Sequence, residues 1–174
     1  MKKLINFLFF SLCCITLQAQ ESKIRNKTIF VEAGGNGYNV SLNYDMRFNK
    51  NSNSGLGFRV GTSAIIENYP ISKDRLTRWT FPLEINYLLG KKLHFLDLGI
   101  GLTPHYVKYE YGNPLFITSK DLIYLTVPSI GYRFQGKKGL MLKANYTPNF
   151  RYVDLPDEKI HISQSIGLCV GYSF

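Results

Sequence analysis

Residues 38–48, with the sequence YNVSLNYDMRF, decide the fold of this chain. The even positions are apolar or aromatic: Tyr38, Val40, Leu42, Tyr44, Met46 and Phe48. The odd positions are polar or charged: Asn39, Ser41, Asn43, Asp45 and Arg47. Side chains alternate between the two faces of a β-strand, whereas a helix would mix the two sets at every turn. The stretch therefore predicts a strand with one apolar face and one polar face.

The same alternation recurs along the rest of the chain. It is regular in residues 56–64, 79–87, 96–106, 140–150 and 162–174. Two further segments, 28–34 and 122–134, alternate less regularly, and the second places Leu125 and Val127 on its polar face. Together these segments predict eight strands, an even number that can close an antiparallel up-and-down barrel.

The connections between these strands alternate in length. Short turns are expected at 49–54, 90–92 and 135–138, and longer loops at 67–77, 107–121 and 151–160. In transmembrane barrels the short turns face the periplasm and the longer loops face the exterior. Both termini of the barrel chain then lie on the short-turn side. The connection at 35–37 departs from the pattern, because it is short where an outer loop is expected.

The N-terminal residues predict export. Lys2 and Lys3 precede an apolar run over 4–17, and Leu17-Gln18-Ala19 offers a cleavage site, so we expect a signal peptide over 1–19 and a barrel domain over 20–174. An uncleaved anchor is the alternative, although the run is shorter than the ~20 residues of a spanning helix. Cleavage removes Cys13 and Cys14, and the remaining Cys169 has no partner for an intramolecular disulfide.

Alternation alone leaves open which face of the barrel is outside. A soluble, lipocalin-like barrel would bury the apolar set, whereas a transmembrane barrel would expose it to lipid. The apolar set is too bulky for the interior of eight strands, and the polar set is rich in Gly and Ser. The aromatic residues also gather near strand ends, as two membrane girdles require. The expected girdle residues are Tyr38, Phe48, Trp79, Tyr87, Tyr106, Tyr124, Tyr132, Phe134, Phe150, Tyr172 and Phe174.

The chain ends on Val170-Gly171-Tyr172-Ser173-Phe174. This ending resembles the C-terminal signature of outer-membrane β-barrel proteins, and the whole pattern is most similar to the small OmpA/OmpX-type barrels. The resemblance implies an outer-membrane location and a final strand, ending in Phe174, that the barrel assembly machinery recognises. It implies no particular activity, because this family is functionally diverse.

The polar face carries charges of both signs. The inward candidates are Glu32, Asp45, Arg47, Arg59, Glu84, Asp97, Arg133 and Lys143. Unpaired charges in a narrow lumen are costly, so we expect a salt-bridge network that closes the barrel. The alternative is a set of charges solvated by lumen water, which would suit a narrow channel for small solutes.

Other functions have weaker support in the sequence. A lipid A-modifying enzyme would use a histidine with a serine and a carboxylate, for which the candidates are His94, His105, His161, Ser163, Asp157 and Glu158. They form no recognisable motif, and no metal-ligand cluster, phosphate loop or nucleophile elbow is present. We therefore expect no enzyme activity, metal or cofactor.

A surface-interaction role is the remaining interpretation. The predicted loops mix basic and aromatic residues, namely Tyr69, Lys73, Arg75, Lys108, Tyr109, Tyr111 and Phe116. The chain has 21 Lys and Arg against 12 Asp and Glu, and an exported basic chain meets anionic lipid head groups rather than nucleic acid. We expect a structural or surface-interaction protein in contact with outer-membrane lipid and lipopolysaccharide; its exterior ligand is unspecified.

Overall fold

A computed structural model describes residues 24–37, 39–71, 73–111, 118–153 and 159–174. For residues 151–153 and 159–161 it describes the backbone and not the side chains. The predicted signal peptide and Tyr38 lie outside the described residues. No helix among the described residues is long and apolar enough to cross a membrane.

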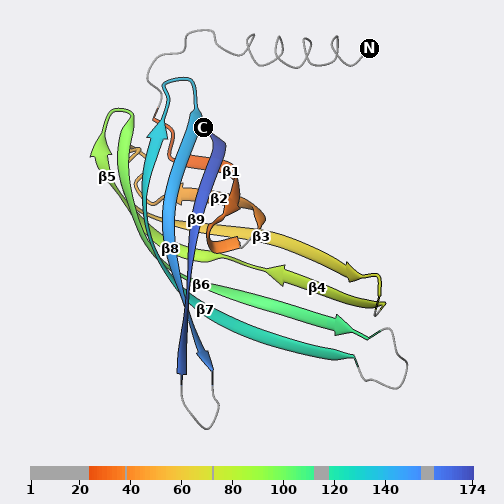
Figure 1. The fold of residues 1–174 in the computed structure, drawn as a ribbon. Helices are drawn as coiled ribbons and strands as arrows, with labels where there is room; N and C mark the ends of the chain where they lie inside the picture. The colour runs from red at the N-terminus through yellow and green to blue at the C-terminus, as the bar shows by residue number, and fades with distance from the viewer. Residues whose placement is uncertain (1–23, 38, 72, 112–117, 154–158) are drawn as a thin grey trace, which may run out of the picture.

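The described chain is almost entirely β-strand (Figure 1). The strands are β1 (Lys27–Gly34), β2 (Val40–Arg47), β3 (Gly55–Tyr69), β4 (Asp74–Thr80), β5 (Leu83–Lys91), β6 (His94–Glu110), β7 (Ser119–Gln135), β8 (Leu140–Val153) and β9 (Lys159–Ser173). A short 3-10 turn, η1 (Gly35–Gly37), joins β1 to β2.

These elements form a closed antiparallel barrel of eight strands, as the alternation predicts. Neighbouring strands pair in sequence order, and β9 closes the ring by pairing with β1. Both β4 and β5 pair with β3 and with β6, so they are two halves of one barrel strand. The halves are separated at Phe81 and Pro82, and the missing N–H of proline explains the interruption of the ladder.

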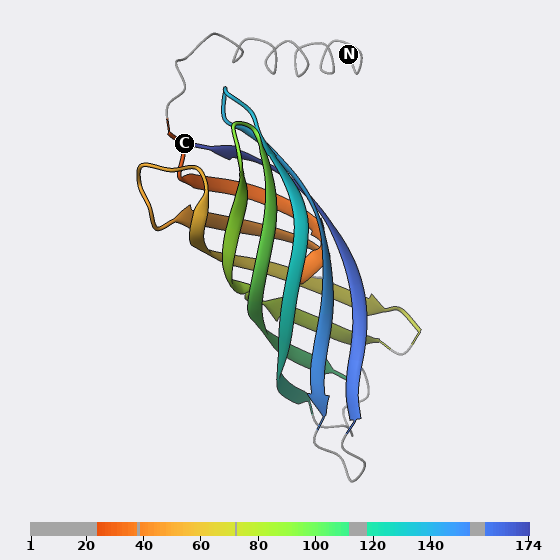
Figure 2. The same ribbon diagram turned by 90° about the vertical axis from the view of Figure 1, so that its left-hand side faces the viewer.

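The strands are strongly tilted, as Figure 2 shows. A circuit of paired residues that starts at Ile29 and crosses every strand arrives at Ile162 on β9. This position is ten residues before Tyr172, the direct β9 partner of Ile29. Such a stagger closes a barrel and tilts its strands relative to the axis.

The apolar set faces outward and the polar set faces the lumen. Ile100 and Leu168 are 62% and 63% exposed, whereas Glu32 and Arg59 are 0% and 1% exposed. Leu125 and Val127 are buried, so the irregular stretch of β7 places two apolar side chains in the lumen. A soluble barrel would have the opposite arrangement, because water would cover its polar set.

Ten of the eleven expected girdle residues are described, and all point away from the lumen, with Phe134 and Phe150 half-buried. Those near the short turns are Phe48, Tyr87, Tyr132, Phe134, Tyr172 and Phe174. Those towards the other end are Trp79, Tyr106, Tyr124 and Phe150. Trp79 is paired directly with Tyr106, so the second group forms a continuous rim across β4 and β6.

The strands are longer than the sequence predicts, and the expected long loops were wrong in extent. Strand β3 continues to Tyr69 and β4 begins at Asp74, within the predicted loop 67–77. The loops predicted at 107–121 and 151–160 are likewise partly strand, since β6 ends at Glu110, β7 begins at Ser119, β8 ends at Val153 and β9 begins at Lys159. Beyond the apolar band charged residues such as Lys108 and Glu110 occupy outward positions, so the ladder continues after the apolar-outward alternation has disappeared.

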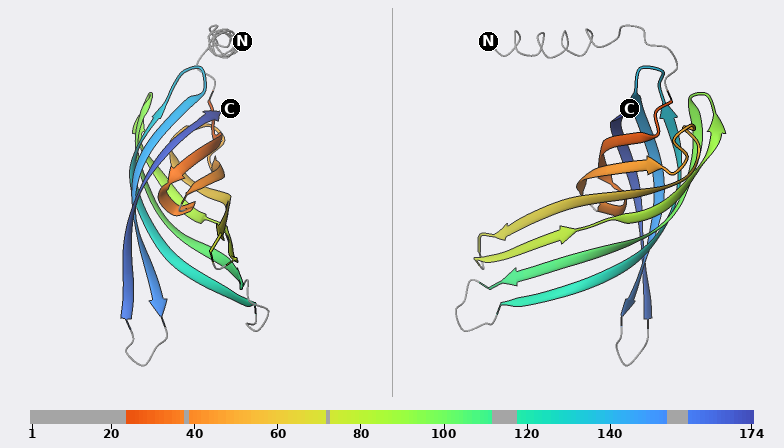
Figure 3. Two further views of the ribbon diagram at one scale, coloured as in Figure 1. Left: turned by 45° about the vertical axis from the view of Figure 1, so that its right-hand side comes forward. Right: turned by 180° about the vertical axis from the view of Figure 1, so that it is seen from behind.

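The extensions separate into two groups. Figures 1 and 3 show β3, β4, β6 and β7 continuing together as one sheet, while β8 and β9 project as a separate hairpin. Hairpin β1–β2 is much shorter, and its ladder with β3 ends at Ser41 and Ser63. Its connection η1 is buried and lies against β3, β8 and β9. Gly34 and Gly35 have φ of 77° and 60°, a left-handed backbone that glycine adopts readily and that turns the chain into the barrel.

Candidate functional site

The lumen holds all eight charged side chains that alternation places inward. They come from seven different elements: Glu32 on β1, Asp45 and Arg47 on β2, Arg59 on β3, Glu84 on β5, Asp97 on β6, Arg133 on β7 and Lys143 on β8. None of these eight residues is more than 5% exposed. Four are cationic and four are anionic, so the formal charges of this set, which we call the lumen network, cancel.

Arg59 organises the part of the lumen network nearest to η1. Its guanidinium forms an ion pair with Glu32 and lies 3.7 Å from Oε2 of Glu84. Its Nε and Nη2 donate hydrogen bonds of 2.9 and 2.8 Å to Oδ1 of Asn43. The guanidinium carbon also lies 5.1 Å from the centre of the Phe30 ring, a favourable cation–π contact. One cation therefore meets two carboxylates, an amide and an aromatic face.

Asp45 organises the part nearest to the short turns. Its carboxylate accepts hydrogen bonds from Arg47 Nη2 at 2.5 Å, Asn86 Nδ2 at 2.6 Å and Arg133 Nη1 at 3.1 Å. Arg47 Nη2 also donates to Oδ1 of Asn86 at 2.6 Å. Two arginines and an amide thus surround one carboxylate, which offsets the cost of burying it.

A third group links the opposite wall of the barrel. Lys143 Nζ lies 2.9 Å from Oδ2 of Asp97, and Arg133 Nη1 lies 3.9 Å from the same oxygen. Arg133 therefore bridges Asp45 on β2 and Asp97 on β6. The pairs Arg133–Asp45 and Lys143–Asp97 connect strands that do not pair with each other in the sheet, so they tie the barrel together across its interior.

Both ends of the lumen network are covered. On the η1 side, Asn36 is 1% exposed and its Nδ2 donates a 2.7 Å hydrogen bond to Oε2 of Glu84. On the short-turn side, the buried side chains of Leu88, Phe95 and Met141 lie between the network and the turns, and Met141 also packs with Phe30 and Cys169. Cys169 Sγ also lies within hydrogen-bonding distance, 3.7 Å, of Glu32 Oε1, so this thiol fills space beside the network.

Inward glycines provide the space that the network occupies. A Cβ at Gly99 would lie 2.5 Å from Oε1 of Glu84, and a Cβ at Gly167 would lie 2.7 Å from Oε1 of Glu32. Sequence reasoning did not identify these glycines, nor Asn36, Asn43 and Asn86, as members of the site. The two glycines, Asn43 and Asn86 share a signal with the charged residues, namely a position on the polar face of a strand; Asn36 lies in the turn η1, where no alternation could identify it.

Those residues considered for catalysis that the structure describes do not come together. His94 lies on the outer surface, where its Nδ1 is 2.5 Å from the hydroxyl of Tyr132, whereas His105 is buried on the lumen side. Ser163 is exposed on β9, while Asp157, Glu158 and the side chain of His161 lie outside the described residues. Among the described residues, no group of three or more His, Cys, Asp or Glu could hold a metal ion.

The residues considered for surface interaction lie on the strand extensions more than on loops. Tyr69, Arg75, Lys108 and Tyr109 are in strands, Tyr111 directly follows β6, and Lys73 is in the β3–β4 turn. Phe116 lies outside the described residues. The Tyr109 hydroxyl donates a 3.0 Å hydrogen bond to Asp74, and this bond raises the pKa of Tyr109.

Comparison with solved structures identifies the architecture. Ail of Yersinia pestis, in complex with the heparin analogue sucrose octasulfate, matches with a TM-score of 0.54 and 13% identity over 87% of this chain and 100% of that chain. The N-terminal β-barrel domain of Pseudomonas aeruginosa OprF matches with a TM-score of 0.54 and 11% identity, over 89% of this chain and all of that chain. Neisserial surface protein A matches with a TM-score of 0.56 and 13% identity, over 86% and 95% of the two chains.

The fold is that of the small outer-membrane barrels. No protein-family model and no curated protein sequence matches the chain. At these levels of identity the likeness extends to the architecture alone, in agreement with the fold expected from the C-terminal strand and the alternation.

Glu84→Ala should destabilise this barrel strongly. The substitution removes a carboxylate that faces both Arg59 and Asn36, and it leaves part of the buried charge of Arg59 uncompensated. The expected loss is about 3–5 kcal/mol of unfolding free energy, measured by urea unfolding in micelles. Glu110→Ala is the matched control, because its ion pair with Lys108 is substantially exposed and such pairs contribute about 0–1 kcal/mol. Equal stability of the two variants would contradict a coupled lumen network.

Proposed function

We propose that this protein is an outer-membrane β-barrel with a closed polar lumen that serves as a structural or surface-interaction protein. The observation that supports this proposal is the lumen network: buried, charge-balanced and covered by Asn36 on one side and by apolar side chains on the other. An open channel would leave its inner charges in water instead of pairing them across the barrel.

The proposal includes the route to the membrane. An N-terminal signal over 1–19 would direct export, and the C-terminal strand would be recognised by the barrel assembly machinery. In support, Phe174 is 46% exposed, and its backbone N–H donates to the carbonyl of Lys27 at 2.8 Å. The final residue thus completes the closing seam of the barrel while its side chain remains accessible on the outer surface.

The closed lumen separates this proposal from a narrow channel. Purified protein in a planar lipid bilayer should produce no discrete conductance steps, because side chains rather than water fill the middle of the barrel. Arg59→Ala, which removes the largest side chain from the η1 side of the network, should permit at least brief openings if it still inserts. Regular steps from the unmodified protein would overturn the closed-lumen proposal in favour of the channel.

The same proposal makes enzyme activity unexpected. Expression of the protein should leave the mass spectrum of lipid A unchanged, because His94 lies on the outer surface whereas His105 faces the lumen. A new lipid A mass would instead favour the lipid-modifying alternative.

A specific observation supports contact with lipopolysaccharide. Lys108 and Lys120 are direct cross-strand partners on the outward face of β6 and β7, and Arg75 lies on the adjacent strand β4. These cations lie just beyond the rim that contains Trp79 and Tyr106, where lipid phosphates would be found. Two like charges placed opposite each other repel, and Glu110, which forms a 2.6 Å ion pair with Lys108, offsets only part of the positive charge of these three cations. The fold-related Ail structure holds a heparin analogue, which supports the capacity of this architecture to accept a ligand of that kind.

Replacing both lysines should weaken binding to lipopolysaccharide. The double variant Lys108→Gln/Lys120→Gln should bind lipopolysaccharide at least tenfold more weakly, since each cation near an anionic surface contributes about 1 kcal/mol. The measurement is titration of lipopolysaccharide into protein in neutral detergent. Lys50→Gln/Lys138→Gln removes the same charge at the opposite end and should have little effect. If both double variants bind equally, the lipid contact does not involve this cluster.

A further inference from the structure

The short-turn end of the barrel has a charge distribution unlike that of the lumen or the strand extensions. The described residues that form this end carry seven cations: Arg25, Lys27, Lys50, Lys91, Lys92, Lys137 and Lys138. The described acidic residues all lie in the lumen or on the strand extensions, so none neutralises these cations locally. A concave surface lined by charge of one sign attracts ligands of the opposite sign.

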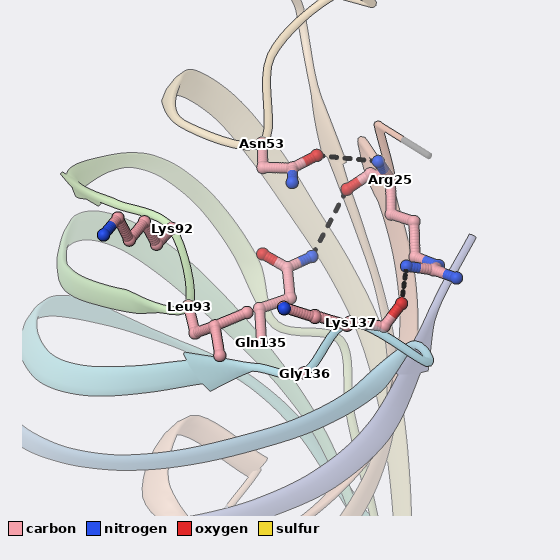
Figure 4. Close-up of a pocket in the computed structure, with 7 residues that line it drawn as sticks. All are labelled: Arg25, Asn53, Lys92, Leu93, Gln135, Gly136 and Lys137. Atoms are coloured by element: carbon pink, nitrogen blue, oxygen red, sulfur yellow. Dashed lines mark hydrogen bonds between the residues drawn. The ribbon is translucent and has the colours of Figure 1, made fainter. Parts of the chain in front are cut away.

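A cavity of about 410 Å³ lies in the middle of this end. Figure 4 shows its lining, which comes from the N-terminal segment and from all three short turns. The lining residues are Arg25, Asn53, Lys92, Leu93, Gln135, Gly136 and Lys137. The cavity therefore joins segments that are far apart in the sequence, and three of its seven residues are cationic.

Hydrogen bonds hold the lining in place. The backbone N–H of Arg25 donates to Oδ1 of Asn53 at 2.7 Å, and its guanidinium Nη1 donates to the carbonyl of Lys137. Gln135 Nε2 donates to the carbonyl of Arg25 at 3.3 Å, as Figure 4 shows. Arg25 is 6% exposed, so this guanidinium is a fixed part of the cavity and not a freely moving surface cation. The contact with Lys137 uses one of the five N–H groups that an arginine carries.

Two features of the lining go beyond what folding requires. The carboxamide oxygen of Gln135 is buried and has no hydrogen-bond partner among the described residues. Lys92 has a φ of 61°, a left-handed conformation that costs a side chain roughly 1–2 kcal/mol and that glycine would adopt without that cost. The unpaired oxygen of Gln135 accepts hydrogen bonds, so a ligand there must donate to it, as a hydroxyl group of an alcohol does, while Lys92 supplies positive charge. Together they indicate that the turn is adapted to a ligand that carries both a hydroxyl group and an anionic group.

We propose that this cavity, which we call the mouth pocket, binds the phosphate of a small phosphate ester. Three cations around one cavity suit an anion with more than a single charge, and a phosphate monoester carries about −1.5 to −2 near neutral pH. Arginine binds phosphate oxygens through paired N–H groups, and lysine binds them as a point charge. The ester could be a periplasmic solute or the head group of a lipid, and access from the periplasm rests on the orientation in the proposed function.

The test is calorimetric titration of protein purified from membranes into neutral detergent micelles. Glycerol 3-phosphate is the soluble probe, and short-chain phosphatidic acid added to the micelles is the lipid probe. Saturable binding of the first alone supports a solute site, and saturable binding of the second alone supports a lipid head-group site. Absence of binding by both probes overturns the proposal.

Variants of the lining provide the decisive comparison. Lys137→Gln should weaken probe binding about fivefold, as expected for one lost ion pair. Lys138→Gln removes the same charge from the next residue, which does not line the pocket, and should leave binding nearly unchanged. Arg25→Lys keeps the charge but loses paired donation, so it should also weaken binding. Equal effects of Lys137→Gln and Lys138→Gln would show that the probe is attracted by the overall positive charge of this end and not by a specific site.

Lys92→Gly separates the proposed site from barrel stability. Glycine relieves the left-handed backbone, so this variant should unfold at a higher temperature while binding the probe about fivefold more weakly. Lys92→Gln retains the strain and should lose only binding. Folding of every variant is checked by the shift of its gel mobility on boiling. Loss of folding can then be distinguished from loss of probe binding. A stabilised Lys92→Gly protein with unchanged binding would contradict the role of Lys92.

Discussion

The structure depends on one constraint: a chain that crosses lipid with strands must pair all of its backbone N–H and C=O groups within the protein. A closed barrel satisfies this constraint, because β9 pairs with β1 and leaves no edge in the closed region. Closure gives every strand two different faces: one contacts lipid and the other lines the lumen. The alternation of apolar and polar residues, the outward girdles and the inward charges all follow from this division.

Closure also determines the chemistry of the lumen. An eight-stranded barrel has room for its own side chains and little else, so charges that face inward must pair with one another. Arg133 on β7 illustrates the result, since it contacts Asp97 on the neighbouring strand β6 and also Asp45 on β2, with which β7 does not pair. Small residues such as Gly99 and Gly167 are the counterpart of this packing, because a side chain at either position would collide with the network. The middle of the barrel is thus suited to stability, and the two ends are available for interaction.

Much of this architecture could be predicted from the sequence, because period two is a local property that each strand carries by itself. The faces of Glu32 or Arg59 follow from their positions alone. The ion-pair partners of these residues cannot be predicted in this way, because the pairing of Arg59 with Glu32 and Glu84 depends on the register and stagger between strands that are distant in sequence. The burial of Asn36 was equally inaccessible, because a three-residue turn shows no period. The strand extensions were missed because charged residues at outward positions, such as Lys108 and Glu110, end the apolar-outward alternation there.

The orientation of the two faces is the central claim, and Ile100→Lys tests it most directly. Ile100 is 62% exposed near the middle of the apolar band, so lysine there would face lipid in this account and water in a soluble barrel. We predict a loss of about 2–4 kcal/mol in unfolding free energy in lipid vesicles. Asn68 also faces outward, but it lies on β3 beyond the apolar band, so Asn68→Lys should lower the unfolding free energy little. If Ile100→Lys were as stable as Asn68→Lys, the apolar face would not be in lipid and the account would be wrong.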